Sequence, residues 1–275
     1  GFQKSNLIFL AARPSMGKTA FVLSMAQNIV LNKKRPATVA MFSLEMAATE
    51  LVQRVLCSTA RVNAQDVRTG RMREEDWQAI TRAMNQLNEA PLYIDDTAAI
   101  TPLEMKAKCR RLQKRHGLDM VIIDYLQLMK GGTKIENRAQ EISMISRQLK
   151  MLAKELKIPV VALSQVGRGV EQRQDKRPGL SDLRESGAIE QDADVVAFIY
   201  RDEYYHPQTE DIGIAEVIIG KQRSGPVGAV RLSFVKRFAA FENLEEDREA
   251  PPPASRIRPP DDGFEVLDDI EDFPL

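Results

Sequence analysis

Short apolar runs alternate along residues 1–200 with longer stretches in which apolar residues recur every three or four positions. The short runs are predicted to be buried strands, and they occupy residues 7–11, 38–42, 92–94, 120–124, 160–163 and 195–200. The longer stretches are predicted to be helices, and they occupy residues 19–31, 47–60, 73–87, 102–116 and 138–156. Near-continuous apolar strands separated by helices are typical of a mostly parallel sheet flanked by helices, so the sequence predicts an α/β fold.

The pattern changes after Tyr200. Two strand-like runs, 214–219 and 229–235, are separated by Gly225-Pro226 and Gly228. Such a pair predicts a hairpin that extends the sheet with antiparallel strands at its edge. The polar connection 167–190 is too long for a simple turn in a compact α/β domain, which favours a functional loop.

Charge divides the chain into two parts. Lysine and arginine total 39, equal to the 39 acidic residues, but 244–275 holds only three of the basic residues and eleven of the acidic ones. The tail also contains six prolines, so we expect residues 1–243 to form one basic domain and 244–275 to be a disordered acidic tail. No apolar run is long enough to span a membrane, and two cysteines make no disulfide framework, which indicates a reduced, intracellular protein.

The first predicted strand leads into a phosphate-binding pattern. Ala11-Ala12-Arg13-Pro14-Ser15-Met16-Gly17-Lys18-Thr19 follows an apolar strand and precedes a helix that should open near Ala20. This is a P-loop arrangement, although Ala12 stands where a glycine is usual. The expected phosphate-binding residues are Ser15, Met16, Gly17, Lys18, Thr19 and Ala20. Lys18 would reach the terminal phosphates of a nucleotide, and the Thr19 hydroxyl would ligate Mg²⁺.

Polar residues end three other predicted strands. Asp124 ends the run 120–124 and is expected to support Mg²⁺. Glu45 follows another strand and is a candidate to activate the attacking water, while Gln165 is a candidate sensor of the γ-phosphate. An alternative for Glu45 is an ordinary acidic residue in the first turn of the next helix, where the helix dipole favours it.

Six segments in order resemble the C-terminal motor domain of DnaB-type bacterial replicative helicases. They span residues 12–19, 42–46, 121–129, 164–165, 182–194 and 221–226, and the resemblance extends over 1–243. It implies a RecA-like P-loop ATPase core that works as a homohexameric ring on single-stranded DNA in the bacterial cytoplasm, uses ATP and Mg²⁺, and moves 5′-to-3′. It also implies a helicase loader as partner, and primase through an N-terminal collar that would precede this chain.

The resemblance also implies roles for individual residues. Glu45 would be the catalytic base with Arg54 as a helper, and Gln165 would couple the γ-phosphate to the DNA loop. Arg223, with Lys221 beside it, would be inserted into the neighbouring subunit's nucleotide site. Ile219, Lys221 and Arg223 would share one face of a regular strand, so we expect the strand to end or turn at Gly220 and release both cations outward.

The DNA-contacting residues implied by the resemblance are Arg184, Glu185 and Gly187. Arg184 would pair with a phosphate, and Gly187 would let backbone N–H groups approach the phosphodiester. No aromatic residue occurs in 167–190, which favours contact with the DNA backbone over base stacking.

Other functions use the same fold. The alternatives are a RecA-like recombinase, a clock-type oligomeric ATPase, and a nucleotide-dependent switch without hydrolysis. The single loop with Arg184 and Glu185 favours the helicase, and the presence of Glu45 and Arg223 disfavours the switch. Apolar residues among the acids of 268–275 suggest a partner-binding tip, although a merely solubilising tail is the simpler interpretation.

Overall fold

A computed structural model of the chain describes residues 2–132, 137–183 and 187–244. Its centre is a nine-stranded sheet in the order β3-β2-β4-β5-β1-β6-β7-β8-β9. The strands are β1 Leu7–Ala12, β2 Val39–Ser43, β3 Leu92–Asp95, β4 Met120–Asp124, β5 Val160–Gln165, β6 Val195–Tyr200, β7 Ile214–Gln222, β8 Gly228–Val235 and β9 Ala240–Asn243. The first six pair in parallel and the last three are antiparallel, which confirms the predicted α/β class and its antiparallel extension.

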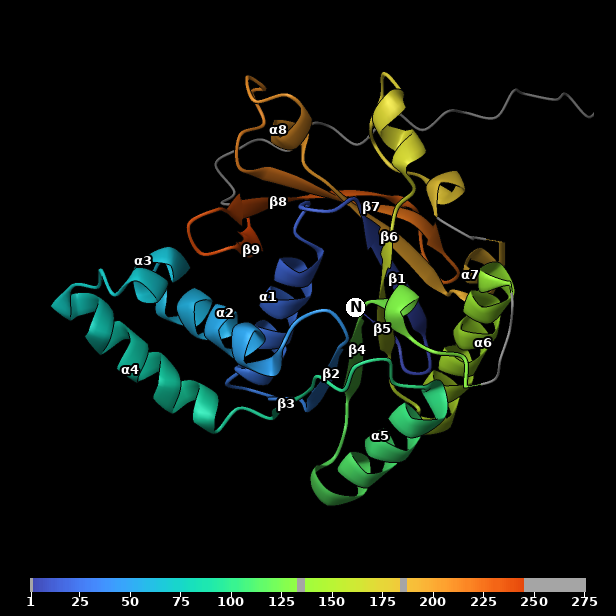
Figure 1. The fold of residues 1–275 in the computed structure, drawn as a ribbon, viewed down its shortest axis with the longest axis horizontal. Helices are drawn as coiled ribbons and strands as arrows, with labels where there is room; N and C mark the ends of the chain where they lie inside the picture. The colour runs from blue at the N-terminus through green and yellow to red at the C-terminus, as the bar shows by residue number, and fades with distance from the viewer. Residues whose placement is uncertain (1, 133–136, 184–186, 245–275) are drawn as a thin grey trace, which may run out of the picture. The chain divides into compact units, whose positions relative to one another are not determined.

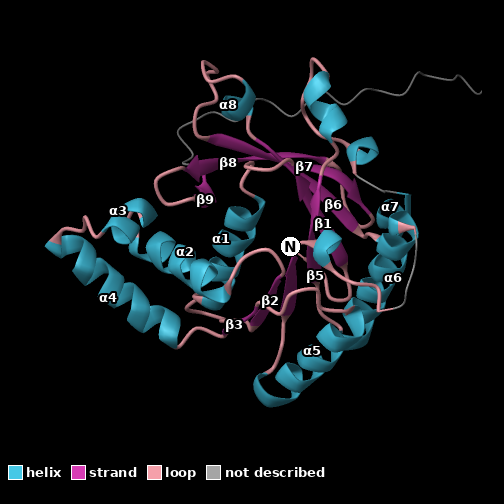
Figure 2. Ribbon diagram, viewed as in Figure 1, coloured by secondary structure: helices cyan, strands magenta, loops and turns pink. Residues whose placement is uncertain are grey.

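Helices cover both faces of the parallel part of the sheet (Figures 1 and 2). They are α1 Lys18–Val30, α2 Ala48–Ala60, α3 Ala64–Thr69, α4 Glu74–Asn88, α5 Pro102–His116, α6 Arg138–Leu156, α7 Gly187–Asp192 and α8 Asp202–Tyr205. Three short 3₁₀ turns are η1 Leu126–Leu128, η2 Arg168–Gln172 and η3 Leu180–Asp182. None of the helices in the described part of the chain combines the length and the apolar character that a bilayer span requires.

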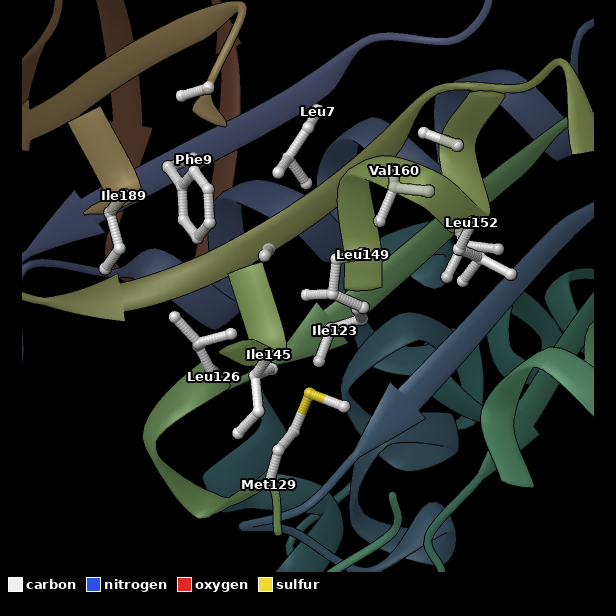
Figure 3. Packing of buried hydrophobic residues seen from close by; sticks show 14 of the residues in the cluster. Leu7, Phe9, Ile123, Leu126, Met129, Ile145, Leu149, Leu152, Val160 and Ile189 are labelled. Carbon is white, nitrogen blue, oxygen red and sulfur yellow. The ribbon is translucent and has the colours of Figure 1, made fainter. Parts of the chain in front are cut away.

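Alternate side chains of each central strand enter different cores. Leu7 and Phe9 of β1 pack with α5 and α6 on one face, whereas Ile8 and Leu10 pack with α1 and α2 on the other. Figure 3 shows the first core, where Leu149 of α6 lies among strand residues and other residues of its own helix. Because both faces are buried, the strands are apolar throughout, and this is why the sequence pattern identified them.

The antiparallel extension contains one irregularity, and here the sequence expectation was wrong. Strand β7 does not end before Lys221 but continues through Gln222. Val196 of β6 faces Lys221 while the next residue, Ala197, faces Ile219, so Gly220 forms a bulge on β7. A bulge inserts one extra residue and reverses the alternation of side chains, so Lys221 is re-aimed without ending the strand. A Cβ at Gly220 would lie 2.9 Å from the ring of Phe198, which is why glycine occupies this position.

The long connection 167–190 and the region after Val235 contain structure that the sequence pattern did not predict. The connection holds η2, η3 and the start of α7, and β9 adds a ninth strand beside β8. These elements are three to six residues long, so hydrophobic periodicity cannot distinguish them from loops. Of the expected acidic tail, 244–275, every residue after Leu244 lies outside the described residues.

Candidate nucleotide site

The P-loop is shaped by two residues with left-handed backbone conformations. Strand β1 ends at Ala12, and the chain turns through Ser15 at φ 66° and Gly17 at φ 97° before α1 begins at Lys18. Gly17 is the N-cap of α1, and its carbonyl accepts a 2.8 Å bond from the Phe21 N–H. The first N–H groups of a helix have no partner within the helix, so those of α1 face the turn as donors for an anion.

Lys18 extends from the first turn of α1 toward the end of β5. Its Nζ donates to the Ser164 carbonyl at 3.2 Å and lies 5.2 Å from the centre of the Tyr125 ring. Burial lowers the pKa of Lys18, although the carboxylates of Asp124 and Glu45 oppose the shift. Phosphate oxygens beside this ammonium would favour its charged form, as expected of a P-loop lysine.

Thr19 and Asp124 form the candidate magnesium site. The Thr19 hydroxyl donates to Asp124 Oδ2 at 2.7 Å, and Asp124 is 1% exposed. Burial raises the pKa of Asp124, against the hydrogen bond from Thr19 and the charge of Lys18. Asp124 Oδ1 is buried without a hydrogen-bond partner among the described residues. A hydroxyl and an unsatisfied carboxylate oxygen at one place are oxygen donors of the kind that Mg²⁺ prefers, so these residues fit the ion.

Strand register brings the other predicted residues to the same edge of the sheet. Ser43 pairs with Asp124, and the Leu44 N–H donates to the Asp124 carbonyl at 2.7 Å, which places Glu45 next to the end of β4. Gln165 pairs with Ala12, directly before the P-loop. The carboxyl ends of β1, β2, β4 and β5 therefore converge, as ligand sites in parallel sheets do.

The start of α2 rules out one of the two interpretations of Glu45. Helix α2 has Ala47 as its N-cap and begins at Ala48, so Glu45 lies before the helix rather than in its first turn. Its side chain is exposed. Its negative charge contributes to the raised pKa of Asp124 and opposes the lowering of the pKa of Lys18. The ordinary helix-start interpretation is wrong, and the acid of the first turn is Glu50. Arg54, exposed on α2, opposes the rise in the pKa of Asp124.

Two residues behind the site were not singled out from the sequence. Gln127 Nε2 donates to the Ser164 hydroxyl at 2.9 Å, so it supports the residue whose carbonyl receives Lys18. The ring of Tyr125 lies under the Lys18 ammonium. Both lie within residues 121–129, one of the segments that resemble the DnaB-type family, but an amide and a phenol in this segment do not by themselves indicate a phosphate-binding role.

Lys221 and Arg223 lie near the amino-terminal end of β1, whereas the P-loop follows its carboxyl end. The Arg223 N–H donates to the Asp194 carbonyl at 2.9 Å, and the Asp194 N–H in turn donates to the carbonyl of Leu7, at the start of β1. The P-loop follows the other end of β1, a strand of six residues that spans roughly 17 Å at ~3.3 Å per residue. Arg223 therefore cannot reach the phosphate site of its own chain.

Both cations contact the C-terminal end of α7. The Lys221 ammonium donates to the Glu190 carbonyl, and Arg223 Nη2 donates to the Gln191 carbonyl at 2.8 Å. Burial and the charge of Arg223 lower the pKa of Lys221. Cations at the carbonyl end of a helix are favoured by the unsatisfied carbonyl groups.

The predicted DNA contacts are described only in part. Arg184 and Glu185 lie outside the described residues. Gly187 is the exposed first residue of α7. Leu183, just before Arg184, pairs with Val166 in an isolated antiparallel bridge, so this segment begins beside the end of β5 and therefore beside the P-loop.

Comparison with known proteins agrees with this geometry. A family model described as the DnaB-like helicase C terminal domain matches residues 1–243. The chain belongs to this family. It is 57% identical over 258 residues to the replicative DNA helicase DnaC of Bacillus subtilis and 56% identical over 258 residues to the replicative DNA helicase DnaB of Geobacillus stearothermophilus. Each alignment covers 92% of this chain and 56% of the relative, so the chain spans little more than half the length of these relatives.

Solved structures give the same result for the fold. One, described as an ATPase domain, matches with a TM-score of 0.85 at 44% identity, over 89% of this chain and 87% of that one. A DnaB-like replicative helicase, described together with its interactions with primase, matches with the same TM-score and identity over 89% of this chain and 59% of that one. The predicted RecA-like core of the DnaB type is therefore confirmed.

Proposed function

We propose that residues 1–243 of this DnaB-family chain are the motor domain of an ATP-driven DNA helicase, followed by an acidic tail. The domain hydrolyses ATP at the subunit interfaces of a homohexameric ring and moves 5′-to-3′ on single-stranded DNA at the replication fork in the bacterial cytoplasm. A helicase loader is the expected partner, and primase is expected to act through the rest of the protein.

The separation between the P-loop and Arg223 carries the proposal. One chain carries Lys18, Thr19, Asp124 and Glu45 at the carboxyl ends of the parallel strands. It carries Lys221 and Arg223 at the opposite ends of these strands. A second copy that packs in the same orientation would bring its Arg223 to the first copy's phosphates. Such head-to-tail contacts generate rings when the rotation closes. This arrangement favours a ring-forming motor over a switch that acts as a single chain.

The residues at the P-loop edge have complementary roles in hydrolysis. Bound Mg²⁺ would neutralise charge on the β- and γ-phosphate oxygens. Glu45 accepts a proton from the water whose oxygen forms a bond to the γ-phosphorus, and the bond from that phosphorus to the bridging oxygen breaks to leave ADP. Lys18 stabilises the transferred phosphoryl group, and the neighbour's Arg223 spreads the developing charge over a delocalised cation, which is worth about 10³–10⁵ in rate.

The test combines hydrolysis with assembly. ATPase activity is measured with and without oligo-dT for the wild type, Glu45→Ala and Arg223→Ala, and the mass in solution is measured with a non-hydrolysable nucleotide and oligo-dT. We expect DNA-stimulated hydrolysis, a hexameric mass, and loss of turnover with retained ATP binding in both variants. A helical filament of variable mass would instead indicate a recombinase, and normal hydrolysis by assembled Arg223→Ala would exclude its action on the neighbour.

A further inference from the structure

Arg13 lies in the P-loop but its side chain points to a different part of the chain. Its Nη1 donates to the Val166 carbonyl at 2.9 Å, and its Nε donates to Glu171 Oε1 at 2.9 Å. The side chain is only 11% exposed, while that of Glu171 is 39% exposed. A planar guanidinium can hold two acceptors in a fixed relative orientation, which a lysine ammonium cannot do. The P-loop and the segment after β5 are therefore joined by two hydrogen bonds from one residue.

These contacts continue toward the predicted DNA-contacting residues. Val166, whose carbonyl accepts the hydrogen bond from Arg13, pairs with Leu183 in the isolated bridge. The N–H of the next residue, Gly167, donates to the Asp182 carbonyl at 2.8 Å. Leu183 is followed directly by Arg184. Val166 thus links Arg13 of the P-loop to Leu183, the residue before Arg184.

Arg13 is also in electrostatic contact with the phosphate site. Its positive charge is one of the causes that lower the pKa of Lys18, after burial. Glu171 and Arg13 also act in opposite directions on the pKa of Tyr205, which burial raises. The pair therefore lies between the nucleotide site and the loop after β5 rather than on an unrelated surface.

We propose that Arg13 is a positioning residue that couples nucleotide occupancy of the P-loop to the position of residues 166–183, which lead to the predicted DNA contacts, with Glu171 as its partner. The inference rests on the proposed function, because it assigns the coupling in a motor that uses both ligands. Arg13 touches neither ligand in this role. It holds the Val166 carbonyl and Glu171 in register with the P-loop, so the segment that begins at Val166 follows changes at the phosphates.

The experiment compares Arg13→Lys and Glu171→Gln with the wild type in the full chain. Arg13→Lys keeps the charge but loses the two-acceptor geometry, and Glu171→Gln keeps an acceptor but loses the charge. We expect the ratio of DNA-stimulated to basal ATPase rates to fall about three- to thirtyfold in Arg13→Lys and less in Glu171→Gln. Basal turnover should change much less than the ratio. The double variant should be no worse than Arg13→Lys, since both changes interrupt one connection.

A second readout does not depend on turnover. Hydrogen exchange of residues 166–172 is followed with and without a non-hydrolysable ATP analogue, and nucleotide binding should alter it in the wild type but not in Arg13→Lys. Arg61→Lys is the matched control, because Arg61 Nη1 also pairs with a carboxylate at 2.9 Å, that of Glu242, away from this segment. If Arg13→Lys folds, keeps the wild-type stimulation by DNA and shows the same nucleotide-induced change in exchange as the wild type, the inference alone is overturned. A wild type whose hydrolysis ignores DNA would overturn the proposed function and, with it, this coupling.

Discussion

The Thr19 hydroxyl donates a 2.7 Å hydrogen bond to Asp124 Oδ2 and so joins the first turn of α1 to the last residue of β4. These residues are 105 positions apart in sequence. Strand β5 lies between β1 and β4 in the sheet, so the two residues meet because β1 and β4 both pair with β5 in parallel and end at the same edge. The contact leaves Oδ1 of the same carboxylate buried and without a partner among the described residues, and this conflict between burial and charge is open to test.

Asp124→Asn should stabilise the protein in the absence of nucleotide and divalent ions while abolishing hydrolysis. The pKa of Asp124 is raised by burial, and a carboxylate whose pKa rises on folding makes the folded state less stable wherever it is charged. Asparagine keeps an oxygen that accepts from Thr19 but carries no charge. We expect a gain of about 1 kcal/mol, which corresponds to roughly 2–4 °C in Tm. Thermal unfolding in EDTA measures it.

The gain should depend on pH in a defined direction. It should be complete above the raised pKa of Asp124 and should disappear as the pH falls below 3.8, the ordinary value, since the group is then protonated in both states. Asp119→Asn is the control, because this exposed residue precedes the same strand and accepts the Thr38 N–H. A lower Tm for Asp124→Asn at neutral pH would mean that attraction to Lys18 outweighs the burial of the charge.

Gly17→Ala should weaken both folding and nucleotide binding. Gly17 has φ 97°, and an added Cβ would lie 3.1 Å from the ring of Phe241 in β9. Gly70→Ala separates the backbone strain from the contact with Phe241. Gly70 also has a positive φ, 69°, but an added Cβ there would meet no atom within 4 Å. Backbone strain alone is worth about 1–2 kcal/mol, so Gly70→Ala should lose this much and Gly17→Ala more. Equal losses in denaturant titrations would show that the Phe241 contact relaxes freely.

The contact with Phe241 illustrates what the sequence could and could not predict. The P-loop, the buried strands and the polar strand ends were predictable, because each has a local pattern with a known chemical meaning. The position of β9 against α1 was not, since a four-residue strand has no distinctive periodicity. The connections of Arg13 to Val166 and of Arg223 to α7 were not predictable either, because they depend on register and on the bulge at Gly220, which composition does not encode.

Neither cysteine should react with thiol reagents in the folded protein. Cys57 and Cys109 are both buried, and burial raises the pKa of Cys109 to about 12. The thiolate is the reactive form, so labelling at mildly alkaline pH requires unfolding. A chromogenic disulfide reagent should titrate both thiols in denaturant and almost none without it. Rapid labelling of Cys109 in the native state would show that the α5 core opens locally.

The placement of Glu45 and Arg223 at opposite edges of the sheet predicts that two inactive variants restore activity when mixed. A Glu45→Ala subunit still presents Arg223, and an Arg223→Ala subunit still carries Glu45. At an interface where Arg223 of a Glu45→Ala subunit meets the P-loop of an Arg223→Ala subunit, the nucleotide site contains both Glu45 and Arg223. In rings assembled randomly from equal amounts, about a quarter of the interfaces have this order.

Turnover in the mixture should therefore rise well above that of either variant alone, which ATPase assays after joint reassembly with oligo-dT would measure. A mixture of Glu45→Ala with a Glu45→Ala, Arg223→Ala double variant is the control, because none of its interfaces has an intact Glu45. If rings proven to contain both single variants stay as inactive as the control, Arg223 does not complete the neighbour's site. Its contacts with the Gln191 and Ala193 carbonyls would then mark it as a support for α7 within its own chain.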